Sequence, residues 1–362
     1  MWNKRKGIEA GDTVILWLTR DAVQPLVVTP GKELNNRFGV YRHSDFIGKL
    51  YGSKISSRNG RGFIHVLRPT PELWTLALPH RTQILYVADI AFITAMLGLK
   101  PGSIVLEAGT GSGSFSHSLA RTIGPHGALH TFEFHESRVN RAREEFQAHG
   151  LSDIIDISHR NVCKDGFGLE NAADAIFLDL PAPWDAIPHV RTALKKDRAA
   201  RICCFSPCME QVLRTVAALN ESTFSDVTMY ETLLRPSEVQ PISLQSVDTV
   251  ADKLKIGEVQ KEARRLRQIE ASVGGQKRKL EELDSAADSA DSNDGTTIQQ
   301  QDPKHNGPAL SKTTIDTAIV SKAPQEVRGH TSYLTFATLL PVAAVTLWIA
   351  EEKASADGLA AC

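Results

Sequence analysis

Short apolar runs alternate with stretches of helical periodicity between residues 103 and 234. The strand candidates are 103–108, 128–134, 154–158, 173–180, 201–206 and 224–234, and the helix candidates between them are 114–123, 136–149, 185–195 and 208–220. Repeated alternation of this kind is typical of a parallel sheet with helices on both faces. The sequence therefore predicts an α/β fold built on a doubly wound parallel sheet.

The flanking segments have a different texture. Strand candidates at 13–18, 26–29 and 62–67, separated by Gly- and Asn-containing turns, predict a small β domain. Beyond residue 250 a charged helix candidate, interrupted at Gly274-Gly275, precedes a stretch rich in Ser, Asp, Thr and Gln. We expect an N-terminal β-rich domain at 1–80, the first part of the α/β domain at 81–250, a largely disordered charged insertion at 251–326, a closing strand at 327–341 and an unassigned tail at 342–362.

Composition narrows the classes of function. The 362 residues carry 41 basic and 42 acidic side chains, whereas a chain that binds nucleic acid alone usually has a basic excess. If the substrate is a nucleic acid, we expect a partner subunit to supply part of the positive surface. Neither a secretory leader nor a membrane span is predicted, because the longest apolar run, 342–350, is too short. The five cysteines show no metal-site spacing, so no bound metal is expected. We expect them to be reduced thiols of an intracellular protein.

A glycine-rich turn, E-A-G-T-G-S-G-S at 107–114, follows the first strand of the alternating region. Glycines allow a tight turn and a close approach of a ligand to the backbone. A dinucleotide fingerprint, G-x-G-x-x-G, would place glycine where Ser114 stands. The acidic Glu107 suits a cationic cofactor better than a pyrophosphate, and S-adenosylmethionine is a cation without phosphate. A purely structural glycine turn is the alternative.

Acidic or amide side chains stand where four successive strands end. Ligands of such sheets bind outside the carboxyl ends of the strands. Glu133 is placed to bind ribose hydroxyls, and Asn161 to bind an adenine beside an apolar wall formed by Val162. With Glu107 and Asp179 they predict one ligand-binding edge. Taken alone, Asn161 is equally consistent with a plain loop, and the nearby Arg138 with a solvated helix charge.

The fourth strand runs into the sequence D-L-P-A-P-W at 179–184. Its two prolines forbid continuation of the strand and stiffen the chain. The result is a rigid corner with the Asp179 carboxylate at one end and the Trp184 indole at the other. A planar heterocycle that stacked on Trp184 could also hydrogen-bond to Asp179. The sequence leaves open whether Trp184 instead packs in the core.

Together these motifs resemble the family of catalytic subunits of eukaryotic tRNA (adenine-58-N1)-methyltransferase. The resemblance covers about 8–240 and 327–341, and its most specific runs are P-H-R-T-Q-I-L-Y at 79–86 and the D-L-P-A-P-W corner. It implies a class I S-adenosylmethionine-dependent methyltransferase fold, with a Rossmann-like doubly wound sheet and a small N-terminal β domain. It also implies tRNA as substrate, a two-plus-two heterotetramer with a related non-catalytic subunit, and a nuclear location.

The resemblance also implies roles for individual residues. Asp179 would be catalytic, accepting a hydrogen bond from the adenine N6 amine, and Trp184 would contact the substrate. Asn161 departs from the Asp usual at its position, although its oxygen can still accept from the adenine amine of the cofactor. With the glycine turn included, the expected cofactor-binding residues are Leu85, Glu107, Gly109, Gly111, Ser112, Gly113, Ser114, Glu133, Arg138, Asn161, Val162 and Asp179.

Three other functions fit parts of the pattern. A different methyltransferase on the same fold, such as a protein-carboxyl methyltransferase, would lack the D-L-P-A-P-W corner. A non-catalytic RNA-binding subunit would be expected to have a degraded glycine turn, whereas 107–113 is intact here. An NAD dehydrogenase is disfavoured by Ser114 and by the lack of an evident base for hydride transfer.

Overall fold

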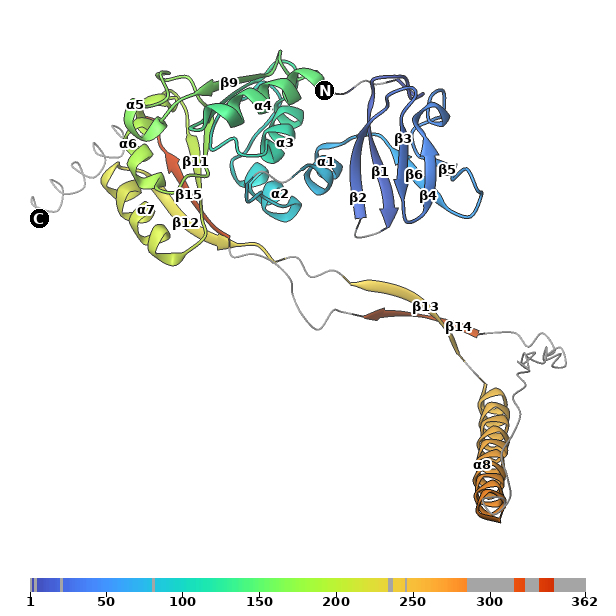
Figure 1. The fold of residues 1–362 in the computed structure, drawn as a ribbon. Helices are drawn as coiled ribbons and strands as arrows, with labels where there is room; N and C mark the ends of the chain where they lie inside the picture. The colour runs from blue at the N-terminus through green and yellow to red at the C-terminus, as the bar shows by residue number, and fades with distance from the viewer. Residues whose placement is uncertain are drawn as a thin grey trace, which may run out of the picture. The chain divides into compact units, whose positions relative to one another are not determined.

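The computed structural model describes residues 2, 5–19, 22–79, 82–233, 237–244, 246–284, 316–322 and 332–341. The chain divides into two compact units (Figure 1). The first consists of Met1–Leu234 and Arg328–Cys362, and the second of Arg235–Val327. The N-terminal β domain and the α/β sheet both belong to the first unit.

The N-terminal domain is a four-stranded antiparallel sheet of order β2-β1-β6-β5 with a separate hairpin, β3–β4. Alternation along the strands sends Val14, Leu16 and Ile64 into a core beneath one face, while Ile15 on the opposite face packs against Trp74 of α1. The bounds are β1 Thr13–Thr19, β2 Ala22–Val27, β3 Glu33–Asn36, β4 Gly39–Arg42, η1 His43–Asp45, β5 Ser53–Ser56, β6 Phe63–Leu67 and α1 Pro71–Ala77.

A seven-stranded sheet of order β12-β15-β11-β10-β7-β8-β9 forms the centre of the α/β domain. Its strands pair in parallel except β15, which is antiparallel to both β11 and β12. The prediction of an α/β fold with a mainly parallel sheet and a late closing strand is confirmed. The bounds are β7 Ile104–Ala108, β8 Ala128–Glu133, β9 Ile155–His159, β10 Ala175–Leu178, β11 Ala200–Ser206, β12 Ser225–Glu231 and β15 Tyr333–Leu339.

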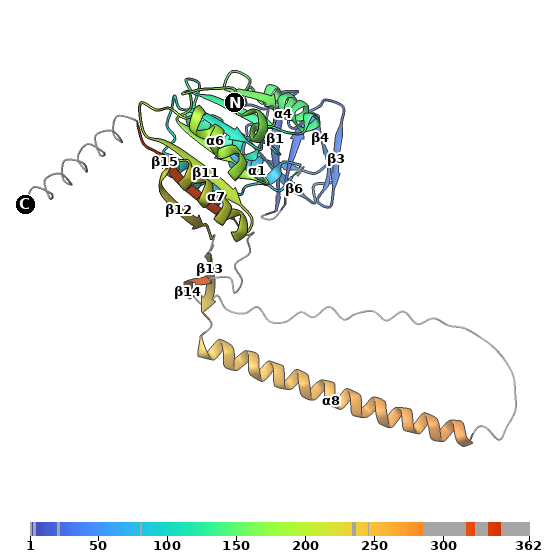
Figure 2. The same cartoon turned by 90° about the vertical axis from the view of Figure 1, so that its left-hand side faces the viewer.

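Helices cover both faces of this sheet (Figures 1 and 2). One core joins the sheet to α2, α3 and α4 through Ile90, Phe115 and Val139, and the other joins it to α6 and α7 through Ile187 and Leu219. The bounds are α2 Val87–Met96, α3 Ser114–Ile123, α4 Glu136–Ala148, α5 Val162–Asp165, α6 Pro183–Ala193 and α7 Met209–Glu221. With both faces covered, ligands have access to the sheet at its strand ends.

The second unit holds the hairpin of β13 Glu238–Leu244 with β14 Asp316–Lys322, and the long helix α8 Val247–Asp284. The expected interruption of the helix at Gly274-Gly275 is wrong: strong helix formers on both sides carry the helix through the two glycines. Strand β14 was also not predicted, because it lies within a stretch of polar composition. The rest of that stretch, 285–315, and the tail 342–362 lie outside the described residues. No helix among the described residues is long and apolar enough to cross a membrane.

Candidate functional site

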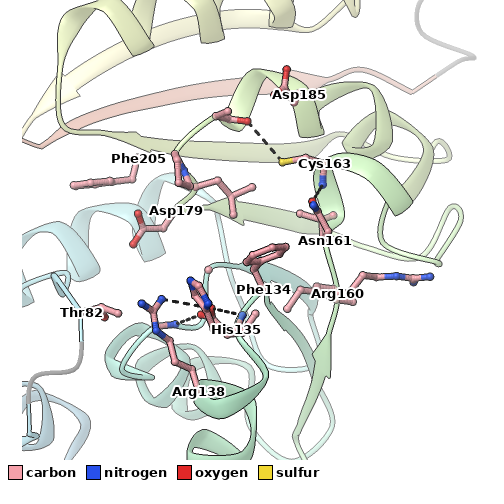
Figure 3. Close-up of a pocket in the computed structure, with 18 of the residues that line it drawn as sticks. Thr82, Phe134, His135, Arg138, Arg160, Asn161, Cys163, Asp179, Asp185 and Phe205 are labelled. Atoms are coloured by element: carbon pink, nitrogen blue, oxygen red, sulfur yellow. Dashed lines mark hydrogen bonds and ion pairs between the residues drawn. The ribbon is translucent and has the colours of Figure 1, made fainter.

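A cavity of about 1390 Å³ opens at the carboxyl ends of β7, β8, β9 and β10 (Figure 3). The predicted site residues that line it are Leu85, Gly109, Gly111, Glu133, Arg138, Asn161, Val162, Asp179 and Trp184. A small adjoining cavity is lined by Glu107, Ser112 and Ser114 together with Gly109 and Asp179. Gly113 lines neither cavity and ends the turn at φ +72° as the N-cap of α3. The structure thus brings all but Gly113 of the predicted residues to one edge of the sheet.

The glycine turn and the Asp179 corner are joined through their backbones. Gly109 has φ +93°, and a Cβ atom there would lie 2.1 Å from the carbonyl oxygen of Asp179. The Gly109 amide donates to the carbonyl of Phe132 at 2.8 Å, and the Asp179 amide donates to the carbonyl of Ala108 at 2.9 Å. Only glycine allows the two loops to approach this closely.

Glu107 lies beneath the turn and is 1 % exposed. Its carboxylate accepts hydrogen bonds from the hydroxyls of Ser116 at 2.6 Å and Thr131 at 2.7 Å. Burial, reinforced by the negative charges of Asp179 and Glu133, raises the pKa of Glu107 to about 7. A cation bound near the floor of the site would therefore stabilise the ionised form of the Glu107 carboxyl group.

Glu133 connects the second strand to the glycine turn. One carboxylate oxygen accepts from the Gly111 amide and the other from the His135 amide, both at 3.0 Å. The Arg138 guanidinium lies 3.5 Å from the second oxygen. Arg138 is thus paired with Glu133 at the cavity wall, and its side chain is also 37 % exposed to solvent.

Asn161 and Val162 form the wall beyond the third strand. The Asn161 side-chain oxygen accepts from the Cys163 amide at 3.1 Å and so caps α5. An amide oxygen has a second lone pair, so Asn161 keeps one acceptor position for a ligand in the cavity that it lines. Val162 is 3 % exposed and supplies an apolar surface.

The Asp179 carboxylate points into the cavity, across from Arg138 and His135 (Figure 3). It makes no side-chain hydrogen bond with the residues that the structure describes. Burial, with a smaller contribution from the charge of Glu133, raises the pKa of Asp179 to about 7. A carboxylate in a cavity that makes no side-chain hydrogen bond with the described residues is available to a ligand that donates hydrogen bonds.

Trp184 lies on the cavity wall, half-buried, and belongs to neither core cluster of the sheet. The Arg214 guanidinium of α7 lies over its ring, 5.2 Å from the centroid. Pro183 occupies the first position of α6, which fixes the exit of the corner. Gln211 also holds the corner, donating from Nε2 to the carbonyl of Pro181 at 2.9 Å.

Several cavity residues escaped the sequence reasoning. The segment 82–84 lies opposite the glycine turn, where the Thr82 and Ser112 hydroxyls are 3.2 Å apart. Phe134 is 59 % exposed directly after Glu133, which is an unusual position for a large aromatic side chain. Position directly after a strand was the available signal for Phe134 and Arg160, and position just before the carboxyl end of β11 was the signal for Phe205, whereas Gln211 had none.

A buried histidine pair lies behind the glycine turn. His117 Nδ1 is 2.6 Å from the Gly113 carbonyl oxygen, and its Nε2 is 2.9 Å from His149 Nδ1. Because a carbonyl only accepts, His117 donates from Nδ1 and His149 donates to His117 Nε2. Burial and the neighbouring His117 lower the pKa of His149 to about 3.

This pair predicts a loss of stability in mild acid. His149 stays neutral in the folded chain but gains a proton near pH 6.5 when unfolded, so its contribution is complete above pH 6.5 and is lost as the pH falls toward 3. We expect His149→Asn to flatten the fall in unfolding free energy between pH 6.5 and 5 by about 1–2 kcal/mol in urea titrations. The exposed His126→Asn serves as control, and identical pH profiles for His149→Asn and wild type would contradict the assignment.

The fold and the site together define a class of protein. The sheet order, the glycine turn after β7 and the acidic strand ends are those of an S-adenosylmethionine-dependent methyltransferase. A solved S-adenosylmethionine-dependent O-methyltransferase from Thermotoga maritima matches with a TM-score of 0.65 and 22% identity, over 92% of this chain and 95% of that one. The tRNA (m1A58) methyltransferase TrmI from Aquifex aeolicus matches with 0.60 and 21% identity, over 93% and 100%. These likenesses establish the fold.

The family follows from sequence comparison. The model of the tRNA methyltransferase complex GCD14 subunit family matches residues 62–339. The tRNA (adenine(58)-N(1))-methyltransferase catalytic subunit TRM61 of Cryptococcus neoformans is 45% identical over 98% of this chain and 87% of its own length. Its counterpart in Schizosaccharomyces pombe is 39% identical over 93% and 95%. The chain belongs to this family, and the resemblance drawn from its motifs is confirmed.

Proposed function

We propose that this chain is the catalytic subunit of a tRNA methyltransferase that transfers a methyl group from S-adenosylmethionine to N1 of adenine-58 in the T-loop. The observation that carries the proposal is the Asp179 carboxylate, which lines the cavity beside the glycine turn and makes no side-chain hydrogen bond with the described residues. The named activity of relatives up to 45% identical supports it. The fold and the family leave no support for a dehydrogenase.

The residues of the cavity fit this cofactor. Glu107, Glu133 and Asp179 face one region, and the pKa of Glu107 is raised in part by the other two charges. A bound cation relieves that repulsion, and S-adenosylmethionine supplies a methyl group on a positively charged sulfur. We assign the ribose to Glu133, the adenine to Asn161 and Val162, and the remaining contacts to Leu85, Arg138 and the turn residues Gly109, Gly111, Ser112 and Ser114, whereas Gly113 shapes the turn as the N-cap of α3.

Asp179 is assigned the positioning of the target base. Adenine N1 has a lone pair and no proton at neutral pH, so no strong base is needed to expose it. The Asp179 carboxylate accepts a hydrogen bond from the N6 amine, which orients N1 and stabilises the positive charge that develops on the ring. The base must leave the folded tRNA to reach the cavity, and Trp184, held under Arg214, offers it a stacking face.

The assembly and the location of the protein belong to this proposal as well. We infer a two-plus-two heterotetramer with a related non-catalytic subunit, supported by the family description as a subunit of a complex and by the formal charge of −1. We infer a nuclear location, supported by the exposed basic run at 264–267 on α8, which is of the kind that import receptors bind.

Co-expression with the candidate partner subunit tests the proposal. Purified complex, S-adenosylmethionine and tRNA are expected to yield 1-methyladenosine at position 58, mapped by mass spectrometry of nuclease fragments. The chain expressed alone is expected to give much less product, because a partner supplies part of the positive surface. Methylation at no adenine, or only at an atom other than N1, would overturn the proposal.

A further inference from the structure

The N-terminal sheet has one face that is only half covered. Ile15, midway along β1, packs against α1 on this face. Farther along, the register places Lys54 of β5 opposite His65 of β6, and His65 opposite Trp17 of β1, so that these three side chains form one row on the same face. Phe63 precedes His65 by two residues and therefore shares that face.

These four residues form a continuous aromatic and basic surface, here called the sheet platform. The Lys54 ammonium lies 3.8 Å from the centroid of the Phe63 ring. The rings of Phe63 and His65 are 5.6 Å apart. Phe63 is 48 % exposed and Lys54 is exposed, whereas His65 and Trp17 are half-buried. The platform thus presents aromatic rings at the surface, with the Lys54 ammonium over one face of the Phe63 ring.

Basic residues outnumber acidic ones around the platform, although Arg42 and Arg58 are paired with Glu33 of β3. None of the strands β1, β2, β5 and β6 contains an acidic residue. The segment 37–68 carries seven Arg or Lys residues and a single acid, Asp45, within a chain whose formal charge is −1. Such local asymmetry favours a polyanion as the partner.

We propose that the sheet platform binds an unpaired segment of the RNA substrate, with a base stacked on Phe63 and a phosphate beside Lys54. The identification of this RNA as tRNA rests on the proposed function. Unpaired bases stack on aromatic side chains of exposed sheets, and lysines beside those rings neutralise the backbone. The platform lies in a domain separate from the cavity, so it contributes affinity for the tRNA and leaves the chemistry of methyl transfer to the cavity.

Binding and kinetics of the full complex test the platform. Phe63→Ala is expected to raise both the Kd and the KM for tRNA at least about 5-fold, while kcat and the Kd for S-adenosylmethionine stay at wild-type values. Phe63→Trp is expected to restore binding. Lys54→Ala is expected to reduce the slope of log K against log salt by about 1. Val27→Ala serves as matched control, because Val27 is 54 % exposed at the other end of the same sheet.

Two results would overturn the platform. One is a wild-type Kd for tRNA in Phe63→Ala with an unchanged salt slope in Lys54→Ala. The other is loss of the partner subunit from Phe63→Ala, since the face would then belong to a protein interface. Failure of the wild-type complex to make 1-methyladenosine would instead refute the proposed function, and the tRNA Kd values would still decide the platform.

Discussion

Asp179→Ala is expected to lower kcat at least about 100-fold in the assembled complex, with the fold retained. The variant removes an acceptor whose side chain makes no hydrogen bond with the described residues, so little structural energy is lost with it. Asp179→Asn keeps the size and one acceptor oxygen but not the charge. We expect it to lie between alanine and wild type, which separates orientation of the amine from stabilisation of charge.

Asp185→Ala is the matched control for this prediction. Asp185 is an exposed carboxylate that lines the same cavity and lies in the same corner of the chain, six residues further on. We expect it to keep the kcat of wild type. S-adenosylmethionine affinity measured by calorimetry is expected to change far less than kcat in Asp179→Ala. Turnover of Asp179→Ala at the wild-type rate would contradict the assigned role of Asp179 in positioning the target base.

The pH profile provides a second readout of Asp179. Its pKa is raised to about 7, and the ionised form is the one that accepts a hydrogen bond from the amine. The value of kcat/KM should therefore fall as the pH drops below about 7 and reach a plateau above it. A bound cation favours the ionised carboxylate, so the limb in kcat should lie at lower pH. Asp179→Asn should lack the limb in both parameters.

The sequence allowed much of this site to be predicted because chemistry and topology coincide there. Parallel strands bring their carboxyl ends to one edge, so Glu107, Glu133, Asn161 and Asp179 were predicted to meet from their positions at or just after strand ends alone. The hydrogen bonds that organise the site were not predictable. The pairing of Glu133 with the Gly111 amide joins residues 22 apart through side-chain geometry, which periodicity does not encode.

The features that were missed share a physical cause. The hairpin of β13 and β14 joins segments more than 70 residues apart, and no local pattern specifies such a pairing. The location of Trp184 depended on what α7 presents to it, namely the guanidinium of Arg214. The continuous helix through Gly274-Gly275 shows that two glycines are tolerated where the flanking propensity is high. Local sequence thus predicts elements better than it predicts their neighbours.

Gly109→Ala is expected to weaken cofactor binding strongly and to destabilise the chain. Alanine at φ +93° costs about 1–2 kcal/mol for the backbone conformation alone. The added methyl group would also lie 2.1 Å from the Asp179 carbonyl oxygen, and backbone cannot yield as a flexible side chain can. Overpacking of this kind adds about 1–3 kcal/mol to the loss of unfolding free energy. Urea unfolding and S-adenosylmethionine calorimetry measure the two effects.

Gly102→Ala isolates the contribution of the contact. Gly102 has φ +87°, nearly the value at Gly109, but a Cβ atom there would meet nothing within 4 Å. It should therefore show the conformational cost only and bind the cofactor as wild type does. Equal destabilisation of the two variants, with cofactor affinity retained in both, would refute the proposed close contact. Because the clash at Gly109 is with Asp179 itself, the surviving activity of Gly109→Ala should fall further than its cofactor affinity: the cofactor turn and the corner that positions the base are held by one another.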